Sequence, residues 1–168
     1  VAELNAAGIK IAREVADAAD RPVLVAGSVG PTGDLFVPLG PLTHEEGVKV
    51  FAEQMQAMAD AGADVLWAET LSSAEEVAAA YEASESVDLP LVIDGDALVP
   101  GLMTVLSARL APTVLTPHDG EWRRLGGDPS PDRIAATVDM ARSTGAVVVR
   151  KGPTTVVASP GGDARIVS

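Results

Sequence analysis

The chain has 168 residues, and its apolar residues, 47% of the total, are mainly Ala, Val and Leu rather than aromatic. The absence of Cys excludes disulfides, zinc–thiolate sites and cysteine nucleophiles, and we expect a cytoplasmic protein. The net charge of −12 argues against binding to the phosphate backbone of nucleic acids, and no apolar run reaches the roughly 18 residues that span a membrane.

The charge is unevenly distributed along the chain. Residues 1–88 contain 4 Lys or Arg and 16 Asp or Glu, a net charge of −12, whereas residues 89–168 contain 8 of each kind, a net charge of zero. Such an asymmetry can mark a boundary between segments of different composition, and it can also be chance variation of the surface. The composition alone leaves both interpretations open.

The first half of the chain alternates helical and extended patterns. Thr43, followed three residues later by Glu46, forms a capping-box pattern that predicts a helix start, and Ser72 or Ser73 is predicted to cap a later helix. In chain order we predict a helix over 3–19, a strand over 23–26, a Gly- and Pro-rich turn over 27–42, a helix over 43–61, a strand over 64–68 and a helix ending near 84.

The second half continues this alternation. We predict a strand over 89–93, a short helix over 99–109, a strand over 113–116, a helical turn over 120–125, a helix over 132–143, a strand over 146–149 and a hairpin of strands over 154–158 and 164–167. The sequence therefore predicts the α/β class, with alternating βα units, a mostly parallel sheet of about five strands flanked by helices, and a C-terminal β-hairpin.

A glycine-rich loop follows the strand predicted over 23–26, at the strand end where α/β folds bind ligands. Ser28 and Gly30 lie in this loop, whose backbone N–H groups can approach an anion closely, although a structural turn explains the same residues. Glu69 follows the next predicted strand and suits a substrate ammonium group. An acid near the N-terminus of a helix is the structural alternative.

Five motifs occur in order within about residues 1–86: Asn5 with Ala12-Arg13-Glu14, then VAGSVGPTG, LTHEE, AGADVLWAET and SSAEE. Together they resemble a bacterial homocysteine S-methyltransferase of the betaine-dependent type. The resemblance implies a segment of a (β/α)8 barrel in which Glu69 holds the amino group of homocysteine and Ser28 and Gly30 line its pocket. The family binds zinc through cysteines, and its opening strand carries an acidic-glycine motif; because neither occurs here, we expect no zinc and no methylation of homocysteine.

Polar residues also follow the predicted strands of the second half. Carboxylates after the strand over 89–93 can hold a ribose or magnesium-bound water, and a lysine after the strand over 146–149 suits phosphate. Taken singly, His118 is explained as a hydrogen-bonding loop residue and Lys151 as a surface charge, so their joint order carries the interpretation as a ligand site. The candidate residues are Asp94, His118, Gly120, Glu121, Lys151, Gly152 and Thr154.

Three motifs over about residues 88–168 carry a second resemblance: LPLVIDGDAL, VLTPHDGEWRRL and VVVRKGPTTVVASPGG. They resemble an ADP- or ATP-dependent NAD(P)H-hydrate dehydratase, a ribokinase-like α/β enzyme that repairs hydrated nicotinamide cofactors. The resemblance implies that Asp94 and His118 face the hydrated cofactor, while Lys151 and Thr154 face the phosphates of ADP or ATP, with magnesium. Asp119 stands where the family usually has Pro. The family's glycine-rich segment with the catalytic aspartate is not among these residues, so we expect an incomplete active site.

We interpret residues 1–168 as a single α/β domain that joins a methyltransferase-barrel-like segment, 1–88, to a ribokinase-like dehydratase segment, 89–168. A chimera, whether engineered, generated or recombinant, explains both resemblances and the charge boundary near Leu89. Our leading hypothesis is a chain with no complete active site and at most weak nucleotide binding. The alternatives are a dehydratase fragment and a homocysteine-binding module that recruits its metal from another chain; the sequence leaves catalytic residues and oligomeric state open.

Overall fold

The computed structural model describes residues 1–71, 73–106, 111–128 and 132–167. Its helices are α1 (Ala2–Asp17), α2 (His44–Asp60), α3 (Ala74–Ala83), α4 (Leu102–Val105), α5 (Asp119–Arg124) and α6 (Arg133–Thr144), with short 3-10 turns η1 (Ser84–Ser86) and η2 (Gly95–Ala97). Its strands are β1 (Ala26–Val29), β2 (Val65–Ala68), β3 (Leu91–Ile93), β4 (Thr113–Leu115), β5 (Val147–Arg150), β6 (Thr155–Ala158) and β7 (Ala164–Val167).

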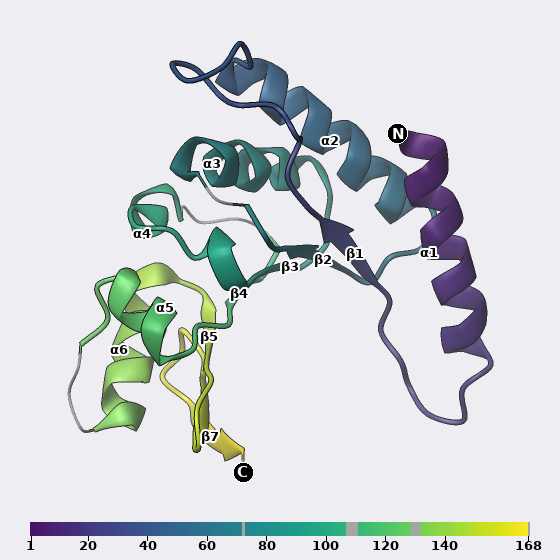
Figure 1. Cartoon of the computed structure of the whole chain (residues 1–168). Helices are drawn as coiled ribbons and strands as arrows, with labels where there is room; N and C mark the ends of the chain where they lie inside the picture. Colours follow the sequence, from purple (N-terminus) through teal and green to yellow (C-terminus); the bar gives the residue numbers. More distant parts are fainter. Residues whose placement is uncertain (72, 107–110, 129–131, 168) are drawn as a thin grey trace.

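The seven strands form one sheet in the order β1-β2-β3-β4-β5-β6-β7. Strands β1 to β5 pair in parallel, and β6 and β7 continue the sheet in antiparallel pairing. Parallel neighbours need crossover connections, which the helices supply. Figure 1 shows α2 and α3 along the β1–β3 end of the sheet and α6 beside the β5–β7 end, and α6 packs on β5 and β6. The predicted α/β class, with a mostly parallel sheet and a terminal hairpin, is confirmed.

The first strand begins later than the sequence predicts. We expected a strand over 23–26 followed by a turn at Gly27, whereas β1 continues through Gly27 to Val29. A Cβ atom at Gly27 would lie 2.6 Å from the Sδ atom of Met58, so glycine here permits close packing of α2 on the strand rather than a turn. Directly before β1, the Val25 N–H donates a hydrogen bond of 2.7 Å to the Asp64 carboxylate, a side-chain acceptor.

Two predicted helix starts are confirmed. Thr43 is the N-cap of α2 and forms the complete capping box with Glu46, and the Ser73 hydroxyl accepts a hydrogen bond from the Glu76 N–H at the start of α3. The predicted helix over 99–109 is represented by α4 alone, and residues 107–109 of that prediction lie outside the described part of the chain. Among the described helices, none is long and apolar enough to cross a bilayer.

The hydrophobic core runs without interruption through both halves of the chain. It includes Phe51 and Leu66 from the first half and Leu115 and Val148 from the second, all nearly inaccessible to solvent. Strand β2 pairs with β3 in register, and the Leu66 N–H donates a hydrogen bond of 2.9 Å to the Pro90 carbonyl. Leu89, where we expected a junction, lies in the connection that leads into β3.

Candidate functional site at the carboxyl ends of the strands

The parallel strands end along one edge of the sheet and place polar residues beside one another. Ala68 of β2 lies opposite Ile93 of β3, which lies opposite Leu115 of β4. The next residue along each strand is Glu69, Asp94 or Thr116, so these three side chains come from adjacent positions on this edge. Ligands of α/β proteins bind outside the carboxyl ends of parallel strands, which makes this edge the candidate site.

Asp94 and Lys151 are in direct contact at this edge. The Nζ atom of Lys151, after β5, lies 2.5 Å from Oδ1 of Asp94, after β3. The Asp94 side chain is 24% exposed and that of Lys151 is 40% exposed, so the pair borders solvent. The backbone N–H of Lys151 donates a 2.8 Å hydrogen bond to the Pro117 carbonyl, which fixes the start of the β5–β6 connection beside β4. A solvent-accessible ammonium held at a strand end is suited to an anionic ligand.

The Asp94 carboxylate is held in its charged form. Burial raises its pKa, but the hydrogen bond from Lys151 opposes this effect. Further hydrogen bonds from the Thr116 side chain and the Gly95 N–H, together with the charge of Lys151, leave the pKa of Asp94 below its ordinary value. Asp94 and Lys151 therefore form a charged pair whose net charge is close to zero.

His118 caps the short helix α5. Its Nδ1 atom accepts hydrogen bonds of 3.0 Å from the N–H groups of Gly120 and Glu121, and the Glu121 carboxylate accepts the His118 N–H at 2.7 Å. The Nε2 atom lies 3.2 Å from Oε1 of Glu121. Because Nδ1 accepts two hydrogen bonds, Nε2 carries the proton of the neutral ring. Of these predicted site residues, His118 and Glu121 thus satisfy each other, and Gly120 gives the imidazole room, since a Cβ there would lie 2.8 Å from Cε1.

The first-half candidates form a separate contact on the same edge. The Ser28 hydroxyl donates a 3.0 Å hydrogen bond to Oε1 of Glu69, and both side chains are exposed. The Glu69 N–H donates to the Val29 carbonyl at 3.2 Å, which continues the β1–β2 ladder to the strand end. Gly30 follows β1 directly. Of the remaining candidates, Gly152 and Thr154 lie in the exposed connection between β5 and β6.

Four polar residues at or near this edge are not among the site residues that the sequence predicts. The sequence pattern predicts Thr116 to be the last residue of a strand, whereas it follows β4 and lies opposite Asp94. The other three are Asp119, Arg133 and Arg150, and Asp119 forms an ion pair with each of the two arginines. Asp119 stands where the resembled motif usually has Pro, but nothing in its spacing points to the two arginines, which lie 14 and 31 positions away.

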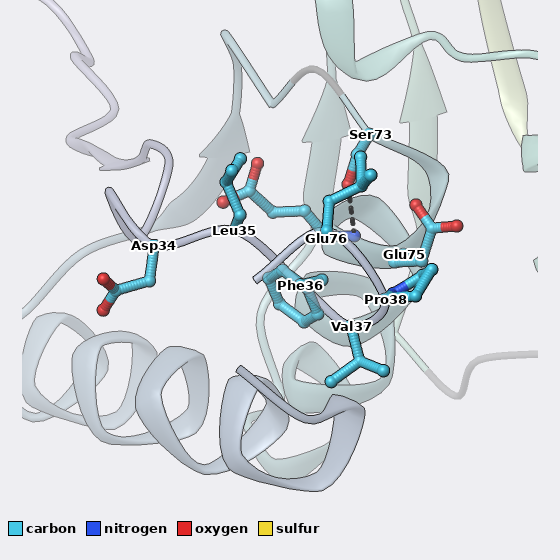
Figure 2. Close-up of a pocket in the computed structure, with 9 residues that line it drawn as sticks. Asp34, Leu35, Phe36, Val37, Pro38, Ser73, Glu75 and Glu76 are labelled. Carbon is cyan, nitrogen blue, oxygen red and sulfur yellow. Dashed lines mark hydrogen bonds between the residues drawn. The ribbon is translucent and has the colours of Figure 1, made fainter. Parts of the chain in front are cut away.

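A small cavity lies elsewhere, between the connection after β1 and the start of α3 (Figure 2). Figure 2 shows Phe36 and Val37 on one side and Glu75 and Glu76 on the other, with the Ser73 cap drawn as a dashed line. Its volume is about 90 Å³, enough for small molecules only. None of the predicted site residues lines this cavity, and one carboxylate oxygen of Glu76 already accepts hydrogen bonds from the N–H and hydroxyl of Thr32.

The zinc of homocysteine methyltransferases does not fit the donors available here. The sequence has no Cys, and the described residues contain no group of three or more His, Cys, Asp or Glu side chains placed to share a metal ion. Zinc sites in proteins use three or four such ligands. The described residues therefore do not form the zinc site of that family.

Proteins similar to this chain fall into two groups, NAD(P)H-hydrate repair enzymes and homocysteine S-methyltransferases. A bifunctional NAD(P)H-hydrate repair enzyme of Mycobacterium tuberculosis is 43% identical over 95 residues, which are 55% of this chain and 20% of that enzyme. The corresponding enzyme of Mycobacterium leprae is 47% identical over 83 residues, 45% of this chain and 16% of the relative. The chain thus spans about a fifth of the length of these curated relatives, or less.

Solved structures agree with the similarity to NAD(P)H-hydrate repair enzymes. An ADP/ATP-dependent NAD(P)H-hydrate dehydratase from Bacillus subtilis, co-crystallised with ATP and Mg²⁺, superposes with a TM-score of 0.53 at 29% identity, over 62% of this chain and 38% of that one. A ribokinase-like superfamily protein from Enterococcus faecalis, with a TM-score of 0.51 and 21% identity, covers 76% of this chain and 44% of its own. The fold is therefore ribokinase-like α/β.

The other group is defined by a family model for homocysteine S-methyltransferase, which matches residues 1–113. This match includes Ser28 and Glu69 and continues past the expected limit near residue 86, through β3 to the start of β4. By this match, which covers well over half of its residues, the chain belongs to the homocysteine S-methyltransferase family.

Proposed function

We propose that the chain binds the phosphates of ADP or ATP at the carboxyl edge of the sheet, in the manner of an NAD(P)H-hydrate dehydratase fragment. The observation that carries this proposal is the accessible Lys151 ammonium, held by Asp94 where the ends of β3, β4 and β5 meet. Support comes from the B. subtilis dehydratase, whose crystals contained ATP and Mg²⁺ and whose fold this chain shares.

The contacts of the site limit the expected affinity. Lys151 supplies one charge-assisted contact, worth about 1.5–3 kcal/mol. The same ammonium already donates a hydrogen bond to the Asp94 carboxylate. Association costs on the order of 4 kcal/mol or more in translational and rotational freedom. This one contact does not by itself offset the cost of association, so we expect binding no tighter than about millimolar. We also expect no ADP-dependent dehydration of hydrated cofactor by this chain alone.

Nuclear magnetic resonance with added ADP and Mg²⁺ tests where the nucleotide binds. The proposal requires amide shifts to concentrate on Asp94, Thr116 and Lys151, and the same titration with adenosine should cause much smaller changes because it lacks phosphate. Shifts confined to the first half of the chain, or equal responses to ADP and adenosine, would contradict the proposed site.

We further propose that the chain joins segments of two families near Leu89. The family match over 1–113, which extends past Leu89, and the similarity to repair enzymes support two family origins. The change from a net charge of −12 over 1–88 to zero over 89–168 supports a boundary near Leu89. The in-register pairing of β2 with β3 gives a physical reason why such a junction is tolerated, because a βα unit of either segment can extend the same parallel sheet.

A second candidate function rests on the Ser28–Glu69 contact. An exposed carboxylate oriented by a hydroxyl at a strand end suits the ammonium group of an amino acid such as homocysteine, and the family match includes both residues. Such a module would need a metal site from another chain. Calorimetry with homocysteine tests this function: binding that is lost in Glu69→Gln would support it, and binding equal in both proteins would reject it.

A further inference from the structure

Three charged residues from three elements meet beside the end of β5. Asp119 is the first residue of α5, Arg133 the first residue of α6 and Arg150 the last residue of β5. Nη1 of Arg133 lies 2.6 Å from Oδ1 of Asp119, and Nε of Arg150 lies 3.3 Å from the same oxygen. One carboxylate oxygen thus joins two helices to a strand. We call these three residues the Asp119 clasp.

The clasp is connected to the candidate site through short contacts. Nη2 of Arg133 donates a 3.3 Å hydrogen bond to the Lys151 carbonyl, and Asp119 directly follows His118, the N-cap of α5. A Cβ atom at Gly152 would lie 2.8 Å from Nη2 of Arg133, so glycine leaves the room that the arginine needs to reach this carbonyl. The clasp therefore links the segment that carries His118 to the segment that carries Lys151.

The two arginines of the clasp depend on the Asp119 carboxylate because they are largely buried. The Arg150 side chain is only 6% exposed, and its guanidinium lies 4.1 Å from the centroid of the Trp122 ring. Nε of Arg133 and Nη1 of Arg150 are buried and have no hydrogen-bond partner in the described part of the chain. Burial and the charge of Arg133 lower the pKa of Arg150, whereas Asp119 raises it. Two close guanidinium groups repel each other, and the shared carboxylate offsets that repulsion.

We propose that Asp119 is a positioning residue for the nucleotide site: its carboxylate holds the loops of His118 and Lys151 in the relative position that the ligand requires. This inference rests on the proposed nucleotide function. We assign Asp119 no direct contact with the nucleotide. It acts through Arg133, which holds the Lys151 carbonyl, and through Arg150, which fixes the end of β5.

The test compares variants that change the clasp with different effects on charge. Asp119→Asn removes the carboxylate, and Asp119→Glu keeps it on a longer side chain. The double variant with Asp119→Asn and Arg150→Met removes one charge of each sign, so it avoids adding net positive charge to a buried cluster. The matched control, Glu45→Gln with Lys49→Met, removes the exposed ion pair on α2.

Two measurements are made on each variant: the hydrogen-exchange rate of the Lys151 amide, which donates to Pro117, and the affinity for ADP. We expect the double variant to unfold cooperatively, to exchange the Lys151 amide at least about tenfold faster than the unmodified chain and to bind ADP about tenfold more weakly, since small displacements of binding groups have large effects. Asp119→Glu should recover most of both losses, and the control should match the unmodified chain.

The two measurements separate this inference from the proposed function. If the unmodified chain fails to bind ADP, the proposed function is overturned, and the role assigned to Asp119 is overturned with it. If the unmodified chain binds ADP, and the double variant keeps its exchange rate and affinity within twofold, the clasp alone is overturned and nucleotide binding stands.

Discussion

The ammonium of Lys151 lies 2.5 Å from the carboxylate of Asp94, although the two residues are 57 positions apart in the sequence. The pair reaches across the end of β4, because Asp94 follows β3 and Lys151 follows β5. This contact gives the candidate site its most defined geometry. It also means that a phosphate group must compete with Asp94 for the same ammonium, which is a physical reason for weak binding.

Replacing Asp94 should reduce stability in a pH-dependent way. We expect Asp94→Asn to lower the free energy of unfolding by about 1 kcal/mol at pH 7, a modest value because both partners border solvent. The pKa of Asp94 is below its ordinary value of 3.8 in the folded chain, so its contribution is present above that value and is lost as the pH falls through the lower, folded-state pKa. The difference between the two proteins should therefore be constant between about pH 5 and 7 and shrink below about pH 4.

Urea unfolding across this pH range measures the difference. Asp96→Asn is the matched control, because the Asp96 side chain is 69% exposed and lies 3.6 Å from Arg124. It should change stability by less than about 0.5 kcal/mol. An Asp94→Asn effect that persists undiminished at pH 3 would show that the carboxylate charge is not its source.

The contacts of His118 predict that its structural role can be separated from any role in binding. His118→Ala removes the acceptor of two N–H groups at the start of α5 and should cost about 1 kcal/mol of stability. His118→Asn keeps an N-cap acceptor and should retain most of that stability. Thermal unfolding of both variants checks this, and an Asn variant as unstable as the Ala variant would contradict the capping role.

Packing around Trp122 predicts a strong effect at a nearby glycine. A Cβ atom at Gly127 would lie 2.3 Å from Cε2 of Trp122, whose side chain is almost completely buried. Gly127→Ala should therefore destabilise the chain by about 1–3 kcal/mol. Gly161→Ala is the control, since the nearest atom to its Cβ, Ser159 Oγ, is 3.6 Å away. Equal unfolding midpoints for the two variants in urea would show that the region around Trp122 adapts without strain.

The order and type of the main elements could be predicted from the sequence because their signals are local. Thr43 and Glu46 mark a helix start by their spacing alone, and the prediction is confirmed. The predicted end of β1, with a turn at Gly27, was wrong because the role of Gly27 is not local: it depends on Met58, which packs against the strand from α2. A glycine that permits close packing and a glycine that permits a turn have the same sequence signal.

The candidate site likewise combines features with local sequence signals and features that depend on contacts between distant residues. Strand ends were predictable, so Asp94 and Lys151 could be assigned to one edge, and the structure brings them into contact. Their mutual pairing was not predictable, because it depends on how far β3 and β5 lie apart across β4. The Asp119 clasp was missed for a related reason: its three residues come from three elements, and no periodicity relates them.

The nucleotide site can be tested by calorimetric titration with ADP and Mg²⁺, in which the unmodified chain is compared with Lys151→Ala and with the control Lys49→Ala on α2. We predict weak binding, with a dissociation constant on the order of 1 mM. Lys151→Ala should weaken this binding by about tenfold or more, and Lys49→Ala should leave it unchanged. Binding that is unaffected by Lys151→Ala, or no binding at several millimolar ADP, would contradict the proposed nucleotide site.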